Sequence, residues 1–257
     1  MKFSIVIPTW NDGRQVGATL KRLRGTSDKE KTEIIVVDGG SKDDTIKSAR
    51  QYADTVIPLG GANRGAQFNK GAGAATGEML LFLHADAQLP GNWQSVLEEF
   101  WSSESGANAA AAVFSVHYGG GFFYALAALG ANLRVSMSQV AYGESSLCTR
   151  RDTYDKAGGF PDYPMMDDVA LCKRLKKQGS VVRLKEKIRP AAHHLRRVGP
   201  IRNAIRSFIV RLRFALGENP ESLFRRYYGG ERKATIAPER WDGEALLKAR
   251  IRGERPR

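Results

Sequence analysis

The strongest constraint on the fold of this chain is a series of short apolar runs that alternate with stretches of helical periodicity. The first four runs have the length of strands and are bounded by glycine, proline or polar residues; they span residues 3–8, 33–38, 55–58 and 79–84. Apolar residues recur at helical spacing over residues 16–23, 43–53, 66–75 and 93–101. This alternation predicts an α/β fold with a mostly parallel central sheet and helices on both faces.

The second half of the chain is less regular. Two further strands are expected over residues 110–116 and 180–185, and two helices over residues 122–137 and 168–178. Residues 200–217 predict an amphipathic helix with an apolar stripe beside arginines. We therefore expect a main α/β domain over residues 1–198, a C-terminal appendage of basic amphipathic helices over residues 199–230, and a polar, flexible tail over residues 231–257.

Charge is unevenly distributed along the 257 residues. Residues 1–172 carry 16 Lys and Arg against 19 Asp and Glu, a net charge of −3, whereas residues 173–257 carry 24 against 8, a net charge of +16. This asymmetry favours an anionic partner for the last third, either a lipid surface or a nucleic acid. A solvated basic face explains the same numbers, and for residues 231–257 we favour that explanation.

The cysteines and the apolar segments indicate a cytoplasmic protein. Cys148 and Cys172 are too few for a disulfide framework or a metal cluster. The N-terminus leads directly into the first apolar run without the pattern of a secretory signal. The longest apolar stretch, 122–131, falls short of the roughly 18 residues that a membrane-spanning helix needs.

Polar residues that suit ligand binding follow three of the predicted strands. Thr9 and Asn11 follow the first strand, Asp38 ends the second, and Asp86 comes just after the fourth. Ligands of such sheets bind outside the carboxyl ends of the strands, so we expect these side chains to share one crevice. A carboxylate there can accept hydrogen bonds from a base or a ribose, or hold Mg²⁺ or Mn²⁺ against a diphosphate. Each residue alone is explained equally well as a turn former or a helix cap.

Two further features suit chemistry at this edge. Asp167 and Asp168 open a predicted helix, where the helix dipole stabilises a carboxylate as a cap or as a general base. Arg64 precedes another helix and could pair with a phosphate or a base. Gly71-Ala72-Gly73 is not a dinucleotide-binding fingerprint, because it lies inside a helical pattern and lacks the third glycine.

Taken in order, these motifs resemble those of the family 2 glycosyltransferases, which have the GT-A (Rossmann-like) fold. The resemblance extends from Lys2 to about Tyr228 and rests on Pro8-Thr9-x-Asn11, Val37-Asp38-Gly39-Gly40-Ser41, Arg64-Gly65-x-x-x-Asn69, Leu83-His84-Ala85-Asp86 and Met166-x-Asp168-Val169. Within the family, the chain most resembles a bacterial subgroup often found beside radical-SAM and selenium-related genes. The additional cues are the segments 130–134 and 142–144.

The resemblance implies a role for each motif. The nucleotide of a nucleoside-diphosphate sugar, a UDP-sugar by family habit, would lie against Pro8, Thr9, Asn11, Asp38, Gly40, Arg64, Asn69 and Asp86. Asp86 would also bind the cofactor, Mn²⁺ or Mg²⁺. Asp168 would be the catalytic base with Asp167 beside it, and Tyr142, Gly143 and Glu144 would lie near the acceptor. The implied reaction is an inverting displacement at the anomeric carbon, with residues 1–198 as the catalytic domain.

The chain departs from the family pattern at three places. His84 replaces the first Asp of the Asp-x-Asp metal motif, which leaves one carboxylate ligand. His193 and His194 stand where relatives tend to carry Arg-Arg-Trp, and His194 is a candidate second metal ligand, although a structural role is commoner for such a pair. The segment 144–146 replaces the more usual Asp-Gln-Gly, so the acceptor is not identified.

Several alternatives remain open at the level of sequence. The helix over 200–217 either lies on an anionic membrane surface, near a lipid-linked acceptor, or packs against the catalytic domain. A sugar nucleotidyltransferase would need a glycine-rich basic loop near the N-terminus, for which residues 11–14 are a poor substitute. A nucleic-acid-binding protein would explain the basic last third but not the acidic strand ends, so we expect no nucleic acid. A catalytically inactive relative would carry the same motifs.

Overall fold

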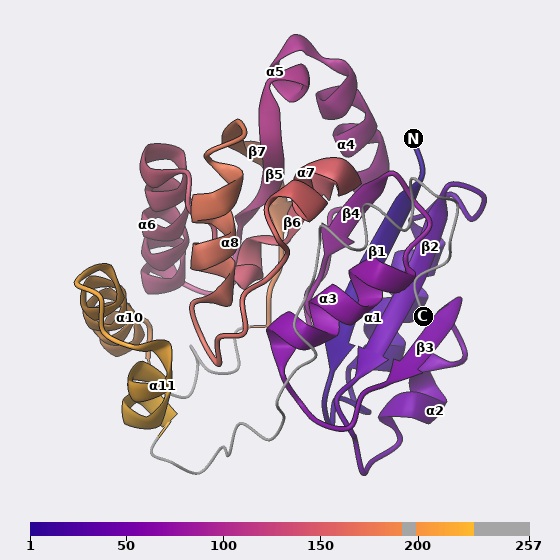
Figure 1. Ribbon diagram of the computed structural model, residues 1–257, viewed down its shortest axis with the longest axis horizontal. Coiled ribbons are helices and arrows are strands. Elements are labelled where there is room, and N and C mark those ends of the chain that lie inside the picture. The colour runs from indigo at the N-terminus through magenta and orange to yellow at the C-terminus, as the bar shows by residue number, and fades with distance from the viewer. Residues whose placement is uncertain (192–198, 229–257) are drawn as a thin grey trace.

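A seven-stranded sheet forms the centre of the protein in a computed structural model that describes residues 1–191 and 199–228 (Figure 1). The strand order is β3-β2-β1-β4-β6-β5-β7. The strands are β1 (Phe3–Thr9), β2 (Thr32–Asp38), β3 (Thr55–Pro58), β4 (Met79–Phe82), β5 (Ala109–Val116), β6 (Leu147–Arg150) and β7 (Ser180–Ile188). All neighbouring pairs are parallel except those of β6, which runs antiparallel to β4 and β5. The predicted α/β fold with a mostly parallel sheet is confirmed.

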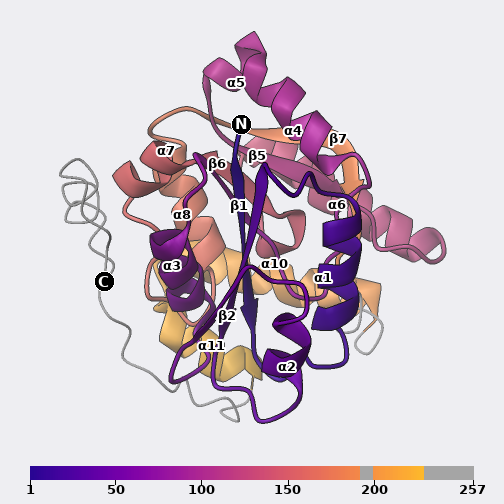
Figure 2. The same cartoon turned by 90° about the vertical axis from the view of Figure 1, so that its right-hand side faces the viewer.

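Helices cover both faces of this sheet. They are α1 (Val16–Gly25), α2 (Thr45–Ala49), α3 (Arg64–Ala74), α4 (Trp93–Ser102), α5 (Glu104–Ala107), α6 (Phe122–Ser138), α7 (Arg151–Lys156), α8 (Asp167–Leu175), α10 (Pro200–Ala215) and α11 (Pro220–Tyr228), with a 3-10 turn, η1 (Gly143–Ser145). Figure 2 shows α1 and α3 on opposite sides of β1 and β2.

The alternation of side chains along β1 explains the two layers. Ile5 and Ile7 pack with Leu20 of α1 and Leu97 of α4 in one buried cluster. Val6, between them in sequence, points to the other face and joins a second cluster with residues of α3, α7 and α8. A strand buried on both faces is uniformly apolar, which is why the sequence shows continuous runs rather than alternating ones.

Helix α3 is held unusually close to the sheet and so fixes the position of its own N-terminus. A Cβ on Gly71 would lie 2.2 Å from Cγ1 of Val6, so only glycine allows this approach. Gln67 Nε2 donates to the carbonyl oxygens of Thr9 (2.9 Å) and Val37 (2.8 Å) at the ends of β1 and β2. The helix starts at Arg64 because the Asn63 side chain accepts a hydrogen bond from the backbone N–H of Ala66 at 3.1 Å.

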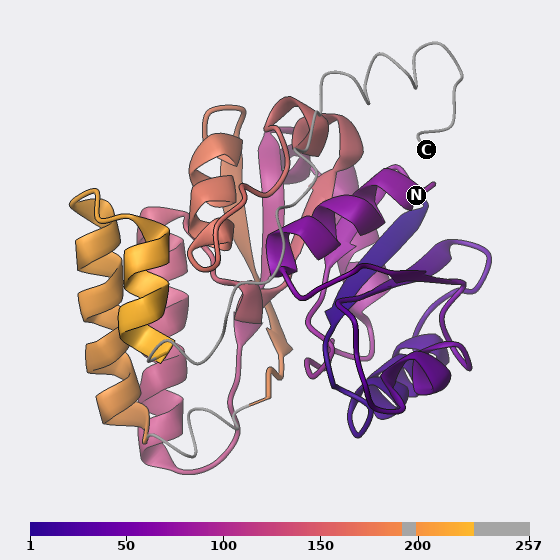
Figure 3. The ribbon, with the colours of Figure 1, turned by 60° about the horizontal axis from the view of Figure 1, so that its bottom comes forward.

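Helix α10 lies alongside α6, and α11 packs against α10, as Figure 3 shows. Val210 of α10 is buried against Met166 and Val169 at the start of α8. The helix therefore packs on the domain with one face, as one alternative predicts, but Phe208 and Leu212 stay 59% and 48% exposed. The domain boundaries stay predictions, and the tail 231–257 lies outside the described residues.

Several predicted boundaries differ from the structure. β6 is not predicted, β4 ends at Phe82 rather than residue 84, and α2 ends at Ala49 rather than residue 53. In contrast, β7 extends to Ile188. None of the helices within residues 1–191 and 199–228 has the length and apolar character needed to cross a bilayer.

Candidate active site

The loops that follow β1 and β2 are organised by one buried carboxylate. Asp38 is completely buried and accepts hydrogen bonds from Thr9 Oγ1 (3.0 Å), the backbone N–H of Gly40 (3.0 Å), and both the backbone N–H (2.8 Å) and the hydroxyl of Ser41. Gly40 has φ +82°, a conformation that favours glycine. Asp38 thus shapes the loop, and the predicted contact between its carboxylate and a nucleotide stays a prediction.

Asn11 joins the first loop to the second. Its side-chain oxygen accepts a hydrogen bond from the backbone N–H of Lys42 at 2.9 Å, and its own N–H donates to Ser41 Oγ at 2.8 Å. Pro8 and Thr9 lie at the end of β1, where Thr9 is buried and Pro8 half-buried. The predicted nucleotide residues Pro8, Thr9, Asn11, Asp38 and Gly40 are therefore neighbours at the carboxyl edge of the sheet, as expected.

A second cluster joins the N-termini of α3 and α8. Arg64 binds Asp167 through two hydrogen bonds, from Nε to Oδ2 at 3.0 Å and from Nη2 to Oδ1. The same Nη2 lies 3.5 Å from Oδ2 of Asp168. Arg64 was predicted beside a phosphate or base; in this structure its guanidinium is engaged with the carboxylates of Asp167 and Asp168.

Asp168 is a buried carboxylate that two backbone N–H groups hold in place. Its Oδ2 accepts a hydrogen bond from the backbone N–H of Gly143 at 2.7 Å, and its Oδ1 accepts one from its neighbour Val169 at 2.7 Å. Burial raises the pKa of Asp168 to about 6, because the charged form is poorly solvated; Arg64 opposes this rise and Asp167 adds to it. At neutral pH the group is therefore ionised yet basic enough to take up a proton.

His84, just past β4, is the third part of this second cluster. Burial lowers the pKa of this imidazole to about 4, with a further contribution from the Arg64 charge, so the ring is neutral at neutral pH. Its Nε2 is buried and has no hydrogen-bond partner among residues 1–191 and 199–228. A Cβ on Gly143 would lie 2.4 Å from Nε2 and 3.4 Å from an Arg64 nitrogen. The end of β4 and the starts of α3, η1 and α8 thus meet at one place.

Asn69 has a structural role that the sequence did not predict. Its Oδ1 accepts hydrogen bonds from Tyr154 Oη (2.6 Å) and from the backbone N–H of Phe160 (2.9 Å), while its Nδ2 donates to the carbonyl of Phe160 at 2.9 Å. The side chain is buried within the helix layer and ties α3 to α7. The amide thus helps to hold the fold together, and the assignment of Asn69 to the nucleotide site stays a prediction.

The described residues suit a metal ion that is shared with a substrate. No group of three or more His, Cys, Asp or Glu side chains within residues 1–191 and 199–228 is placed to hold a metal. Asp86 is half-buried on the loop after β4, two residues beyond His84. Mg²⁺ and Mn²⁺ often take only one or two protein ligands when phosphate oxygens supply others, so one carboxylate is a compatible donor set. His193 and His194 lie outside the described residues.

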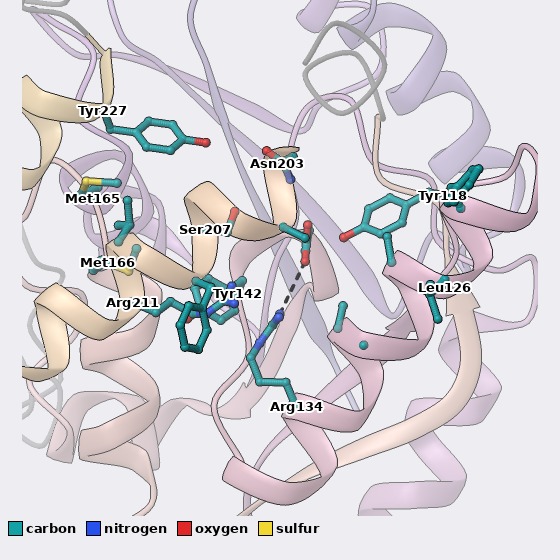
Figure 4. Close-up of a pocket in the computed structure, with 18 residues that line it drawn as sticks. Tyr118, Leu126, Arg134, Tyr142, Met165, Met166, Asn203, Ser207, Arg211 and Tyr227 are labelled. Carbon is teal, nitrogen blue, oxygen red and sulfur yellow. Dashed lines mark ion pairs between the residues drawn. The ribbon is translucent and has the colours of Figure 1, made fainter. Parts of the chain in front are cut away.

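A cavity of about 660 Å³ adjoins the second cluster, between η1 and helices α6, α10 and α11 (Figure 4). Two of the predicted acceptor residues, Tyr142 and Glu144, line it. The sequence analysis assigned no role to the other polar residues that line it, Tyr118, Arg134, Asn203, Ser207, Arg211 and Tyr227. The motif at 130–134 signals Arg134, but its neighbours come from segments that only the fold brings together.

The chain matches a known family model over most of the sheet. The model described as glycosyl transferase family 2 matches residues 4–189, which include the whole sheet except the first residue of β1. An uncharacterized glycosyltransferase of Nostoc sp. is 34% identical over 111 residues, 40% of this chain and 34% of that protein. The chain thus spans about a third of the length of this curated relative.

Solved structures of low sequence identity share the fold. A mannosyltransferase from Pyrobaculum calidifontis, solved with GDP-mannose and Mn²⁺, superposes with a TM-score of 0.62 at 18% identity. The superposition covers 98% of this chain and 75% of the mannosyltransferase chain. Residues 1–349 of S. aureus TarS, solved with UDP-GlcNAc, give a TM-score of 0.57 at 18% identity and cover 72% and 56%. At these identities the likeness establishes the fold.

Proposed function

The chain belongs to glycosyl transferase family 2, and we propose from this premise that it transfers a sugar from a nucleoside-diphosphate donor to an acceptor hydroxyl with inversion. The observation that carries the proposal is Asp168, a buried carboxylate with a pKa raised to about 6 at the N-terminus of α8. It lies beside Arg64 at the N-terminus of α3, and Gln67 of the same helix bonds to the ends of β1 and β2, where a nucleotide would bind.

The donor would lie along the carboxyl edge of the sheet, against Thr9, Asn11, Gly40 and the loop that Asp38 organises. We favour a UDP-sugar; the fold neighbours support nucleotide sugars generally, since one was solved with UDP-GlcNAc and another with GDP-mannose. Asp86 would hold Mn²⁺ or Mg²⁺, with His194 as a candidate second ligand. Such a cation neutralises charge on the departing diphosphate.

The chemistry assigned to the protein is one proton transfer and the positioning that it needs. Asp168 accepts the proton of the acceptor hydroxyl as its oxygen bonds to the anomeric carbon and the bond to the diphosphate breaks. The backbone N–H of Gly143 and the Arg64 guanidinium hold Asp168 in place. Asp167, ion-paired with Arg64, fixes that guanidinium. No covalent intermediate on the protein is required.

A nucleotide screen tests the donor site and the metal together. Thermal shift and calorimetry with UDP, GDP and UDP-sugars, with and without Mn²⁺, should show Mn²⁺-dependent binding of at least one nucleoside diphosphate. Asp86→Ala should weaken that binding at least about tenfold, because it removes a charged metal ligand. Asp152→Ala, which removes an exposed carboxylate from α7, is the matched control. Equal Mn²⁺-dependent affinity in wild type and Asp86→Ala would rule out the metal role.

We further propose that α10 rests on an anionic membrane, on the inner face of the plasma membrane, and that the acceptor is lipid-linked. Ile205, Phe208 and Leu212 are exposed on α10, and the helix carries four arginines and no acidic residue. Flotation with anionic liposomes at low and high salt tests this; no association at either salt concentration contradicts it.

The finer family placement and the domain boundaries are also part of this proposal. The motifs at 130–134 and 142–144 support the bacterial subgroup associated with radical-SAM and selenium-related genes. We place the catalytic domain at 1–198 and the amphipathic helices at 199–230. The sheet and its loops all lie within the first of these ranges.

A further inference from the structure

The cavity beside η1 lies next to the proposed base, with Tyr142 between them. Tyr142 lines this cavity and also lines a small hollow whose other walls include Arg64, Gly143 and Asp168. A molecule in the cavity would therefore lie one side chain away from the Asp168 carboxylate. At about 660 Å³, the cavity has the size of sites that hold small organic ligands.

The inner end of the cavity carries an excess of positive charge. Glu144 is already matched, because Arg134 Nη2 lies 3.8 Å from its Oε1. Arg211 has no carboxylate within 4 Å in the part of the chain that the structure describes. The guanidinium carbons of Arg134 and Arg211 lie 4.4 Å and 5.7 Å from the centre of the Tyr142 ring.

Two further observations favour the binding of an anion at this end. Arg134 Nε is buried and has no hydrogen-bond partner within residues 1–191 and 199–228. Arg211 is half-buried and lines the cavity, and its burial lowers the pKa of the guanidinium. Buried donors and half-buried cations that lack partners are costly unless a ligand supplies the acceptor. An acidic group between Arg134 and Arg211 would satisfy both.

The outer end of the cavity is apolar and opens on an exposed apolar surface. Phe123 and Leu126 of α6 and Phe208 of α10 line it while remaining 54%, 54% and 59% exposed. Eleven of the thirteen large hydrophobic side chains that are exposed in the described residues lie on α6, on α10 or at the residue that ends α10. Neither helix contains Asp or Glu. Concentration of this kind marks a binding surface.

We propose that this cavity is the acceptor site and that it takes an anionic amphiphile. The acidic headgroup lies between Arg134 and Arg211, the apolar chain lies along Phe123, Leu126 and Phe208, and a hydroxyl near the headgroup reaches Asp168. The assignment of this ligand as the acceptor rests on the proposed function, whereas its binding does not. A lipid presented at the apolar surface of α6 and α10 is the source that the exposed side chains favour.

Calorimetry with three probes tests the recognition without any donor present. Octyl phosphate, below its micelle concentration, should bind at least about tenfold more tightly than either 1-octanol or inorganic phosphate, because it alone engages both ends of the cavity. Equal affinity for octyl phosphate and octanol would show that no anion is recognised. Equal affinity for octyl phosphate and inorganic phosphate would show that the apolar end contributes nothing. Either result overturns the proposal.

Two charge-removing variants of α10 locate the site. Arg211→Gln should weaken octyl phosphate binding about tenfold. Arg202→Gln removes the same charge from an exposed position outside the cavity and should leave binding unchanged.

Phe208→Ser, with Ile209→Ser as its control, tests the apolar end of the cavity without altering charge. Equal losses in variant and control contradict the proposal, provided that their melting temperatures match the wild type.

The nucleotide experiments keep the two proposals separable. UDP binding in the presence of Mn²⁺ is measured on the same Arg211→Gln protein and should be unchanged, because Arg211 is remote from the loops of β1 and β2. Normal UDP binding with no preference for octyl phosphate overturns only this inference. Octyl phosphate recognition with no nucleotide binding overturns the proposed glycosyl transfer and leaves an amphiphile-binding site.

Discussion

Replacement of Arg64 by glutamine should move the pH dependence of sugar transfer toward higher pH. Asp168 must be deprotonated to act as the base, so activity is lost as the pH falls through its pKa, which is about 6 in the wild type. The Arg64 guanidinium, 3.5 Å from Oδ2 of Asp168, favours the charged form. Without Arg64 the protonated form of Asp168 is favoured, so the acidic limb of the pH–rate profile moves to higher pH.

The size of this pKa shift follows from the distance between the Arg64 and Asp168 charges and from the exposure of Arg64. Two unit charges at this separation interact with about 1.2 kcal/mol in bulk water and about 4.7 kcal/mol at an effective dielectric constant of 20. The Arg64 side chain is 36% exposed, so solvent screens it and the lower figure applies. Since about 1.4 kcal/mol corresponds to one pKa unit, the pKa of Asp168 should rise by about one unit, to about 7.

The assay is the pH dependence of kcat, measured from about pH 5 to pH 9. At pH 6 the wild type should retain about half of its maximal rate and Arg64→Gln about a tenth. Arg64→Lys keeps the positive charge but loses the paired hydrogen bonds to Asp167, and it should keep the wild-type profile even where its maximal rate is lower. An unshifted profile in Arg64→Gln, in a protein that still binds nucleotide, would refute the reasoning.

Two other substitutions probe the geometry of the same site. Gly143→Ala should lower the rate of transfer at least about tenfold with little change in UDP affinity. The added Cβ would lie 2.4 Å from His84 Nε2 and would displace the backbone that holds Asp168. Turnover at the wild-type rate would contradict this prediction. Asp38→Asn should lower the free energy of unfolding by about 2–4 kcal/mol in urea titrations, because an amide nitrogen replaces an acceptor among four hydrogen-bond donors. Asp44→Asn, at an exposed neighbouring position, is its control, and equal stability of the two variants would show that the carboxylate does not organise the loop.

The sheet was predictable from sequence where burial alone determines the structure. β1 and β2 are buried on both faces, so each reads as an uninterrupted apolar run of the right length. β6 is only four residues, Leu147–Arg150, and ends in a threonine and an arginine. It is a strand because β4 and β5 flank it with open edges, and this tertiary cause leaves no local signal.

The sequence predicted those site residues that lie at the ends of strands. The rule that ligands bind at the carboxyl edge placed Thr9, Asn11 and Asp38 together, and the loops of β1 and β2 do meet there. The pairing of Arg64 with Asp167 depends on the fold bringing the N-termini of α3 and α8 together and has no signature in sequence. The structural role of Asn69 was not predicted, because its spacing from Arg64 matches the family motif, whereas its amide faces Tyr154 and Phe160 in the interior.

The face of α6 shows a further limit of sequence reasoning. The helix was predicted with nearly correct ends, but its apolar residues gave no indication of which side would remain uncovered. In the structure Val135 is buried against the sheet, whereas Leu129, Leu133 and Met137 stay exposed. A helix that is apolar on most sides is expected to be buried, so the exposure of α6 had to come from the structure.

The central claim, that Asp168 is the base of a sugar transfer at the edge of the sheet, is tested most directly by Asp168→Asn. The variant should bind the donor nucleotide with Mn²⁺ as the wild type does and lose at least about a hundredfold of its transfer rate, since amides do not accept the acceptor proton. Single-turnover transfer and nucleotide affinity would be measured on the same preparation. A variant that transfers sugar at the wild-type rate would show that the base lies elsewhere.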